Sequence, residues 1–481
     1  MTSLPKLWLF VLVAPCLSGG ALGQMTAQQA YLKASNTEVQ DGFGYSVAVS
    51  GDTVVVGAFG EDSSALGVGG DEQDNGAGQS GAVYVYVRDG TTWSQQAYLK
   101  ASNTDWYDAF GGTVTVLDDD TVVVGAPGEK SNATGIDGDQ EDDSLGQAGA
   151  AYVFVRQGVT WSQQAYIKAS NTDGFDSFAL SMSSSRGTLV IGAPYEDSNA
   201  TGADGDQYDE SATRSGAVYV FVRNGTHWSQ QTYLKASNTD ANDNFGFSVN
   251  LSVDQLVVGA PFEASAAVGV NGDQSDNSAP GAGATFLFKR SGESWNQVAY
   301  LKASNTEGGD LFGETVAVSE NLVAVGAWRE SSDSDGIQPD QSDNSAQWAG
   351  AAYTFDLKAW TDMGCALAGV SGDPLLVGTG TLAEDSVSAF GLSYAAPSAP
   401  CLLFVALSST PTSFKGGTIK AFPPLIEPIF LVTNPAGTLS QLFRGAPGLP
   451  SGTTLWFQFV IQDAAAVFGV SLSNAIVVTT L

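Results

Sequence analysis

The chain has 481 residues, and its 51 acidic against 19 basic side chains give a formal net charge of −32. This charge excludes nucleic acid or an anionic membrane surface as an expected partner, because like charges repel. Apolar residues make up 43% of the chain, so it can bury a core and is not disordered. Its length indicates repeats or several domains in place of one core.

The N-terminus has the pattern of a secretory signal. A short apolar run, Leu7–Leu17, follows Lys6, and small residues lead to a predicted cleavage between Gly23 and Gln24. The run is too short to span a membrane comfortably, and Pro15 disfavours lipid attachment at Cys16. We therefore expect residues 1–23 to be removed, leaving a secreted or cell-surface protein with no membrane insertion.

One phrase, Tyr-Leu-Lys-Ala-Ser-Asn-Thr, recurs through most of the chain at intervals of 67 or 68 residues, with Ile167 replacing the leucine once. Its copies begin at Tyr31, Tyr98, Tyr166, Tyr233 and Tyr300. A constant period of this size indicates an array of supersecondary units. The predicted units lie near residues 28–97, 98–165, 166–232, 233–299 and 300–358.

Each unit contains four strand-like segments. In the fourth unit they are Tyr233–Ser237, Phe245–Val249, Leu256–Ala260 and Thr285–Lys289, with a long polar loop at Glu263–Gly283. The third segment is apolar throughout in every copy, which indicates burial on both faces. Sheets stacked face to face around an axis satisfy that burial, whereas isolated four-stranded beads leave apolar faces wet. The sequence thus predicts an all-β fold: a β-propeller of about five four-stranded blades over residues 24–358.

A two-part motif supports this fold. Each unit carries Phe-Gly followed by Gly-Ala-Pro or a close variant. The copies are Phe43-Gly44 with Gly57-Ala58-Phe59, Phe110-Gly111 with Gly125-Ala126-Pro127, Phe178-Ala179 with Gly192-Ala193-Pro194, Phe245-Gly246 with Gly259-Ala260-Pro261, and Phe312-Gly313 with Gly326-Ala327-Trp328. Residues 28–358 resemble the FG-GAP repeat family of the integrin α-subunit headpiece and many bacterial exported proteins. The resemblance implies a propeller used for binding and adhesion rather than catalysis.

Calcium is a possible cofactor, although not at the place that the resemblance suggests. Integrin-type repeats often carry a calcium loop between the two motif parts, but here that stretch is a hairpin too short for one, and Asp118-Asp119-Asp120 reads as a solvated turn. The long loops instead hold recurring carboxylates, which either ligate Ca²⁺ or cap their own turns. The candidate metal ligands are Asp71, Asp74, Asp137, Asp139, Asp142, Asp204, Asp206, Asp209, Asp273, Asp276, Asp340 and Asp343.

Other repeated side chains favour structural roles. We expect the phrase lysines (Lys33, Lys100, Lys168, Lys235 and Lys302) to lay their stems on apolar surface with their heads in water. Trp93, Trp161, Trp228 and Trp295 are predicted to pack between blades, with a carbohydrate-binding belt as the alternative. His227 occurs in one unit only, and no catalytic triad, zinc or phosphate-loop pattern is present. No catalytic residue is therefore predicted.

After Phe355 the phrase stops and the composition shifts. Strand-like runs at Leu402–Leu407, Leu455–Ile461 and Ala475–Val478 predict a β-sandwich-like domain over residues 359–481, with further blades as the alternative. Cys365 and Cys401 remain after signal removal, and export favours a disulfide between them over two thiols.

The sequence supports three functions. The first is a non-enzymatic, monomeric binding or adhesion protein for an extracellular protein or carbohydrate. The second is a hydrolase with carboxylates on one propeller face, and the third is a spacer without a ligand. Near-symmetric faces favour binding or spacing, whereas converging non-repeated polar side chains favour an enzyme.

Overall fold

The computed structural model describes residues 28–320, 322–337, 341–357, 360–362, 367, 374–379, 387–414, 417–421, 424–425, 428–444, 453–464, 466 and 470–479. Within these ranges the protein contains strands and no helix, which confirms the all-β prediction. The predicted signal, its cleavage site at Gly23 and Gln24, and the residues Asp340 and Cys365 lie outside these ranges.

The first four repeats each form a four-stranded antiparallel sheet, with strands in chain order from the inner to the outer edge. The strands are β1 (Ser46–Ser50), β2 (Thr53–Ala58), β3 (Ala82–Asp89) and β4 (Thr92–Leu99) in the first sheet; β5 (Thr113–Asp118), β6 (Thr121–Ala126), β7 (Ala150–Gln157) and β8 (Thr160–Ile167) in the second; β9 (Ser181–Ser185), β10 (Thr188–Ala193), β11 (Ala217–Asn224) and β12 (His227–Leu234) in the third; and β13 (Ser248–Ser252), β14 (Gln255–Ala260), β15 (Ala284–Ser291) and β16 (Ser294–Leu301) in the fourth.

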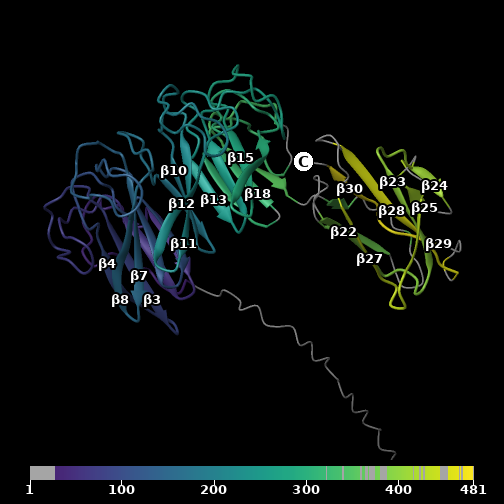
Figure 1. Ribbon diagram of the computed structural model, residues 1–481, viewed down its shortest axis with the longest axis horizontal. Helices are drawn as coiled ribbons and strands as arrows, with labels where there is room; N and C mark the ends of the chain where they lie inside the picture. The colour runs from purple at the N-terminus through teal and green to yellow at the C-terminus, as the bar shows by residue number, and fades with distance from the viewer. Residues whose placement is uncertain are drawn as a thin grey trace, which may run out of the picture.

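The fifth sheet has three strands in the described part of the chain: β17 (Thr315–Val318), β18 (Leu322–Ala327) and β19 (Ala351–Asp356). Neighbouring inner strands pack in the order β1, β5, β9, β13, β17. The sheets therefore follow one another as blades in a propeller-like row, with the first and fifth blades at its two ends (Figure 1).

The prediction that the phrase opens each blade is wrong. Tyr98 and Leu99 end the outer strand β4, which begins near Trp93 and pairs with β3. The residues after Lys100 lead into the next blade. The sequence did not indicate the full outer strand, because its first half, from Trp93 to Gln96, is mostly polar and partly exposed.

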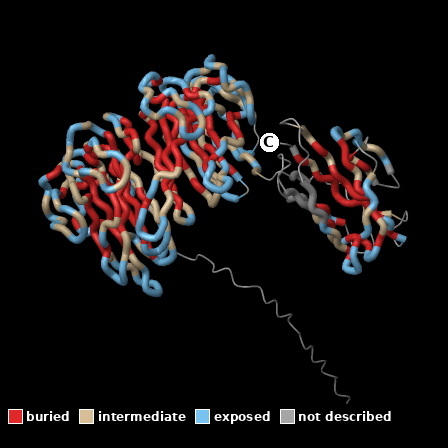
Figure 2. Tube along the Cα trace, in the orientation of Figure 1, coloured by how far each residue is buried: buried red, intermediate tan, exposed pale blue. Residues whose placement is uncertain are grey.

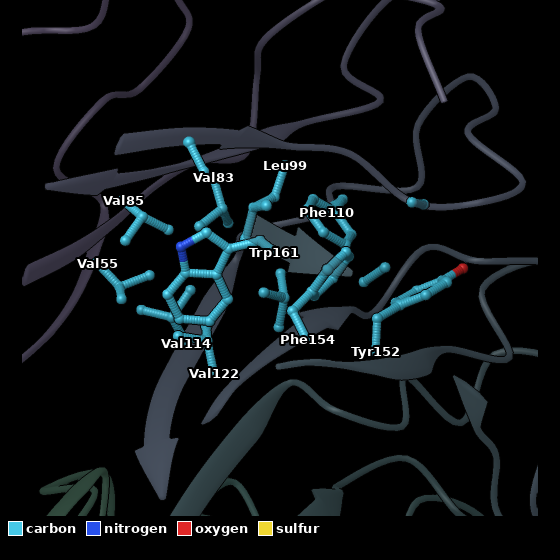
Figure 3. Close-up of a cluster of buried hydrophobic side chains, with 14 of the residues drawn as sticks. Val55, Val83, Val85, Leu99, Phe110, Val114, Val122, Tyr152, Phe154 and Trp161 are labelled. Carbon is cyan, nitrogen blue, oxygen red and sulfur yellow. The ribbon is translucent and has the colours of Figure 1, made fainter. Parts of the chain in front are cut away.

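Apolar side chains from two blades make each of the cores between them. Figure 3 shows the first of these cores, where Val55, Val83 and Val85 of the first blade meet Val114 and Val122 of the second. Trp161 of the second blade lies in the same cluster with only 3% of its surface exposed. Figure 2 shows the same pattern along the row, with buried strands and exposed loops. Burial on both faces of the strands β2, β6, β10 and β14 thus arises as predicted.

Glycine at the start of the Gly-Ala-Pro motif lets neighbouring blades approach. A Cβ on Gly192 would lie 2.1 Å from the carbonyl oxygen of Gly246 in the next blade. The Ser181 hydroxyl donates a hydrogen bond of 2.7 Å to the same carbonyl. Because this contact is backbone to backbone, no side chain can move aside to make room.

The two ends of the row differ from its interior. On the first blade Val47 and Val49 are 67% and 69% exposed, whereas Val249 and Leu251, which occupy the same positions in the fourth blade, are 8% and 6% exposed. The difference arises because a preceding blade covers the fourth blade and none covers the first. On the last blade the alternate residues of β19, Ala352 and Thr354, are exposed on the face that the earlier blades pack against the next blade.

The C-terminal region forms a separate β structure. Its strands are β20 (Trp360–Asp362), β21 (Leu375–Thr379), β22 (Val387–Ser393), β23 (Pro400–Ala406), β24 (Thr412–Phe414), β25 (Gly417–Ile419), β26 (Ile429–Val432), β27 (Leu439–Arg444), β28 (Thr454–Gln462), β29 (Val470–Leu472) and β30 (Ile476–Thr479). The larger sheet has the order β20-β30-β28-β23-β26, with β29 beside β28, and a second sheet has the order β21-β22-β27. Phe390 and Leu392 of the second sheet share a core with Leu403, Phe457 and Phe459 of the first, so the packing is sandwich-like and not that of further blades.

Cys401 lies buried in β23, and burial raises the pKa of its thiol form to about 11. Since Cys365 lies outside the described residues, the disulfide between the two remains a prediction.

Candidate binding face and the buried network beneath it

The strand order places all the long connections at one end of the blades. In the first blade the short turns, at residues 50–53 and 89–92, lie at one end, while residues 59–81 and 100–112 connect strands at the other. The same holds in each repeat, and Figure 1 shows the long loops gathered beyond one end of the sheets. We call this end the loop face.

A buried glutamate anchors the loops of each blade. Glu196, two residues after Pro194, is 1% exposed and accepts hydrogen bonds from Asn171 Nδ2 (3.0 Å) and the Tyr233 hydroxyl (2.7 Å). Lys235 Nζ lies 2.8 Å from its other oxygen. Asn171 belongs to the preceding copy of the phrase and Lys235 to the following copy, so each phrase joins two consecutive blades. Glu61, Glu129 and Glu263 make equivalent contacts.

The prediction that the phrase lysines have solvated heads is wrong for four of the five. Lys100, Lys168, Lys235 and Lys302 are fully buried, and each lies 2.8 or 2.9 Å from its glutamate. Burial lowers the pKa of each of these lysines, against the opposing effect of the paired carboxylate. Only Lys33, in the first copy, is exposed.

A second set of buried carboxylates precedes the Phe-Gly motif: Asp41, Asp108, Asp176, Asp243 and Asp310. Each accepts a hydrogen bond from the backbone N–H three residues earlier, as Asp243 does from Asp240 at 3.0 Å. Burial raises the pKa of Asp108 to about 7 and that of Asp176 and Asp243 to about 8. These carboxyls brace the short loop that reaches the loop face, and sequence reasoning missed them.

These pKa values predict that stability falls as pH rises. A carboxyl with a folded-state pKa near 8 and an unfolded value of 3.8 favours the fold fully below pH 3.8, and its contribution declines as pH rises toward 8. We expect the melting temperature to fall between pH 4 and pH 8. The Asp176→Asn/Asp243→Asn variant should flatten that slope, because it keeps the acceptor oxygens without a charge. Replacing exposed Asp89 with Asn should leave the slope unchanged, and a melting temperature that rises over this window would contradict the assignment.

The short loops hold bulky residues in a left-handed backbone conformation. Tyr107 has a φ of 65° and Phe175, at the same position of the next repeat, a φ of 72°. Side chains of this size rarely adopt such values. Gln40, Asn242 and Gly309 have a positive φ at the same position of the other repeats, so this backbone conformation belongs to the repeated turn, which here presents the rings of Tyr107 and Phe175. Both rings are also exposed, by 60% and 66%, and Trp106 beside them is 51% exposed.

More aromatic side chains lie on the same face. Tyr208 is 70% exposed in the third long loop, and Phe262 is 42% exposed after the fourth Gly-Ala-Pro motif. On the fifth blade the guanidinium of Arg329 lies 4.5 Å from the ring centre of Trp328 and 5.3 Å from that of Trp348. These residues differ from repeat to repeat, in contrast to the network beneath them. The loop face is therefore a constant scaffold with variable aromatic contacts.

A hollow on this face lies between the third and fourth blades. It has a volume of about 730 Å³ and is lined by Tyr195, Arg214, Asp240, Asn242 and Phe262, among others. Arg214 lies over the Tyr195 ring at 5.6 Å.

The carboxylates predicted to ligate calcium bind backbone N–H groups of their own loops. Asp206 accepts from Tyr208, Asp142 from Ser144, and Asp276 from Ala266. Asp204 accepts from the backbone N–H of Tyr233 at 3.0 Å, and Asp137 accepts from that of Tyr166 in the same way. The other candidates that also accept from nearby backbone N–H groups are Asp71, Asp74, Asp139, Asp209, Asp273 and Asp343. In the described ranges no group of three or more Asp, Glu, His or Cys side chains is placed to hold a metal ion. Asp118–Asp120 ends a strand and turns, and Asp120 pairs with Arg156 at 2.8 Å.

The tryptophans lie away from the loop face and pack between blades, as predicted. Trp161, Trp228 and Trp295 are nearly buried, and each indole N–H donates to a glutamine of the preceding outer strand, as Trp161 does to Gln96 at 2.9 Å. Trp93 donates to Gln29 in the same manner. His227 is exposed at the start of β12.

The constant network and the row of four-stranded sheets define a repeat protein of the β-propeller class. The chain belongs to the FG-GAP repeat family, whose model matches residues 26–86, 93–154, 161–221, 228–288 and 295–355. No curated protein matches it.

Two solved structures are similar at very low identity. The parainfluenza virus 5 hemagglutinin-neuraminidase ectodomain is 7% identical, with 91% of this chain and 80% of that chain covered and a TM-score of 0.28. A tetra-tandem repeat from the extending region of a large adhesion protein is 10% identical, with coverage of 91% and 98% and a TM-score of 0.15. Both TM-scores are too low to carry an argument about this chain.

Proposed function

We propose that this protein is an exported, non-enzymatic binding protein that recognises an extracellular protein or carbohydrate through its loop face. The observation that carries the proposal is the set of exposed aromatic residues that vary between repeats on an otherwise constant scaffold. Tyr and Trp supply large contact areas with a polar edge, which suits both protein and sugar surfaces. FG-GAP repeats are typical of extracellular proteins, and no helix in the described part of the chain is long and apolar enough to cross a membrane.

A catalytic role has less support. The buried aspartates recur in every repeat and bind backbone N–H groups, which is the behaviour of structural side chains. The hollow lined by Tyr195 and Arg214 contains two carboxyl groups, Asp240 and Asp243, but Asp243 is buried and accepts the backbone N–H of Asp240, as its counterparts do in the other repeats.

The binding proposal predicts a large effect of two neighbouring side chains. Trp106→Ala/Tyr107→Gly removes two exposed rings, and glycine accepts the φ of 65° at residue 107. We expect at least a tenfold loss of binding to ligands found by a glycan array or a pull-down from extracellular protein, with an unchanged melting temperature. Val159→Ser at the opposite end of the blades, where Val159 is 73% exposed, is the matched control. Equal losses from both variants, or none from the first, would contradict a binding role for the loop face.

Calcium in the long loops remains part of the proposal. Each acidic loop has carboxylate oxygens that are not used in its turns, together with backbone carbonyls, and these are the ligands that Ca²⁺ prefers. We expect millimolar CaCl₂ to raise the melting temperature by a few degrees, and Asp139→Asn/Asp142→Asn to reduce the rise. Equal effects of MgCl₂ and NaCl at matched ionic strength would indicate charge screening alone, which would contradict specific calcium sites.

A further inference from the structure

The first copy of the repeated phrase lacks the partners that the other copies have. Tyr31 is 81% exposed, whereas Tyr98, Tyr166, Tyr233 and Tyr300 are buried and donate to a glutamate. Lys33 is exposed as well. The second half of this phrase is fully engaged, because Asn36 donates to Glu61 at 2.9 Å. Tyr31 and Lys33, in the first half of this phrase, thus correspond to the end of an outer strand but have no glutamate partner in the described ranges.

The last blade has the complementary gap. Glu330 is 3% exposed and accepts from Asn305 Nδ2 at 3.0 Å and from Ser332 N at 3.2 Å. In the described ranges it receives no tyrosine hydroxyl and no lysine, both of which its four counterparts receive. A buried carboxylate without a cation is costly.

In the described part of the chain the last blade also has no outer strand of the kind that brings those donors. Among the described strands β19 pairs with β18 alone, while the corresponding β15 pairs with both β14 and β16. The chain after β19 leaves this edge, because β20 pairs with β30 in the C-terminal region. An unpaired strand edge is a template for another strand.

Residues 29–34 already lie against the first blade in the position of a preceding outer strand. Trp93 Nε1 donates to Gln29 at 3.0 Å, as Trp161 does to Gln96 of β4 at 2.9 Å. The Tyr86 hydroxyl donates to the carbonyl of Lys33 at 2.7 Å. The first blade therefore presents both an exposed apolar face, at Tyr45, Val47 and Val49, and the strand end that a preceding blade needs.

We propose that copies of this chain join head to tail, with the first blade of one copy docked on the fifth blade of another. The incoming residues 28–33 add to β19, and the incoming Tyr31 and Lys33 complete the Glu330 site. Four interfaces between blades of this chain supply the template for this contact. The occupant is a second copy because β1 and β17 are the two ends of the series of packed inner strands, and Val47 and Val49 of β1 are exposed, so the fifth blade of the same chain does not cover them.

The close contact between a motif glycine and the backbone of the following blade also supports docking of a first blade on the fifth. Gly57, Gly192 and Gly259 each lie against a carbonyl oxygen of the following blade. A Cβ added at Gly326 would meet atoms of Thr315 alone, which belongs to the same blade. The space beside Gly326 is therefore open for the carbonyl of Gly44 of the incoming blade. Such a contact joins different surfaces of the two copies, so it extends into rings or filaments. The charge of −32 per copy opposes association at low salt.

Two single-site variants separately block the docking surfaces of the first blade and of the fifth blade. Lys33→Glu reverses the charge that meets Glu330 and leaves the last blade intact. Gly326→Ala fills the space for the incoming backbone and leaves the first blade intact. Both changes lie at the exposed ends of the row, so dilute samples of each variant should stay folded, with Lys33→Glu melting at the wild-type temperature and Gly326→Ala only slightly below it.

The experiment measures mass by sedimentation of the full secreted chain in 0.5 M NaCl over a hundredfold range of concentration. The wild type should grow beyond a dimer, and each variant alone should remain monomeric. A mixture of the two variants should form a one-to-one dimer that does not grow, because one intact head and one intact tail remain. A wild type that stays monomeric at every concentration would overturn the proposal. If residues 31–33 of that monomer are protected from hydrogen exchange, the first blade closes on the fifth blade of the same chain, which also overturns it. A mixture that stays monomeric would overturn it equally.

Discussion

Replacing Lys235 with methionine should lower the free energy of unfolding of its blade by about 3–5 kcal/mol, because the change leaves Glu196 buried without its cation. Both side chains are almost fully buried and lie 2.8 Å apart. Asn171 and Tyr233 would still donate to Glu196 but cannot balance its charge. Hydrogen exchange of β10–β12, together with calorimetry, measures the loss, because a repeat array can open one blade at a time.

The first copy of the phrase provides a matched control for this change. Lys33→Met makes the same substitution at an exposed lysine with no glutamate partner, and it should change the stability of a dilute sample by less than about 0.5 kcal/mol. The double change Lys235→Met/Glu196→Gln should recover at least half of the loss, because it removes both charges together. Equal effects at Lys33 and Lys235 would contradict the role given to the buried pair.

The sequence alone could predict the scaffold because the scaffold depends on repetition. The constant period, the apolar runs such as Val122–Val124 and the Phe-Gly and Gly-Ala-Pro motifs indicated buried sheets stacked as blades, and the structure has that arrangement. The strand-like runs after residue 400 likewise became β23, β28 and β30 of a sandwich-like region.

The buried polar network was not predicted, because its members are distant in sequence and polar in type. Lys235 and Glu196 are 39 residues apart, and a lysine in a strand-like run ordinarily keeps its head in water. One signal was available: a glutamate stands two residues after the third motif position in all five units, as at Glu61 and Glu330. A charged residue kept in every copy at a fixed distance from a buried motif indicates a partner inside the fold.

The loop face depends on the residues that do not repeat. Trp106, Tyr107 and Phe175 occupy positions held by Val39, Gln40 or Asn242 elsewhere, so a search for repeated features passes over them. Their exposure and their positive φ angles are properties of the folded loops. The period therefore identifies the scaffold, and departures from the period identify the candidate contacts.

Gly192→Ala should cost about 2–3 kcal/mol, the upper part of the range for an overpacked core. The added methyl carbon would lie 2.1 Å from the carbonyl oxygen of Gly246 and 2.4 Å from Ser181 Oγ. Since β10 is fixed by pairing with β9 and β11, the strain must separate the third blade from the fourth. We expect a lower melting temperature and faster hydrogen exchange in β10 and β13.

Gly326→Ala is the matched control, since Gly326 holds the same motif position in the last blade. There the added carbon meets the Thr315 hydroxyl at 2.4 Å and no backbone of a following blade. The threonine side chain can rotate away, so the cost should stay below about 1 kcal/mol in a dilute sample. The difference between the two variants measures how much of the glycine requirement comes from contact between blades. Equal costs would place that requirement within the single sheet, and the close approach of the blades would then not explain the motif.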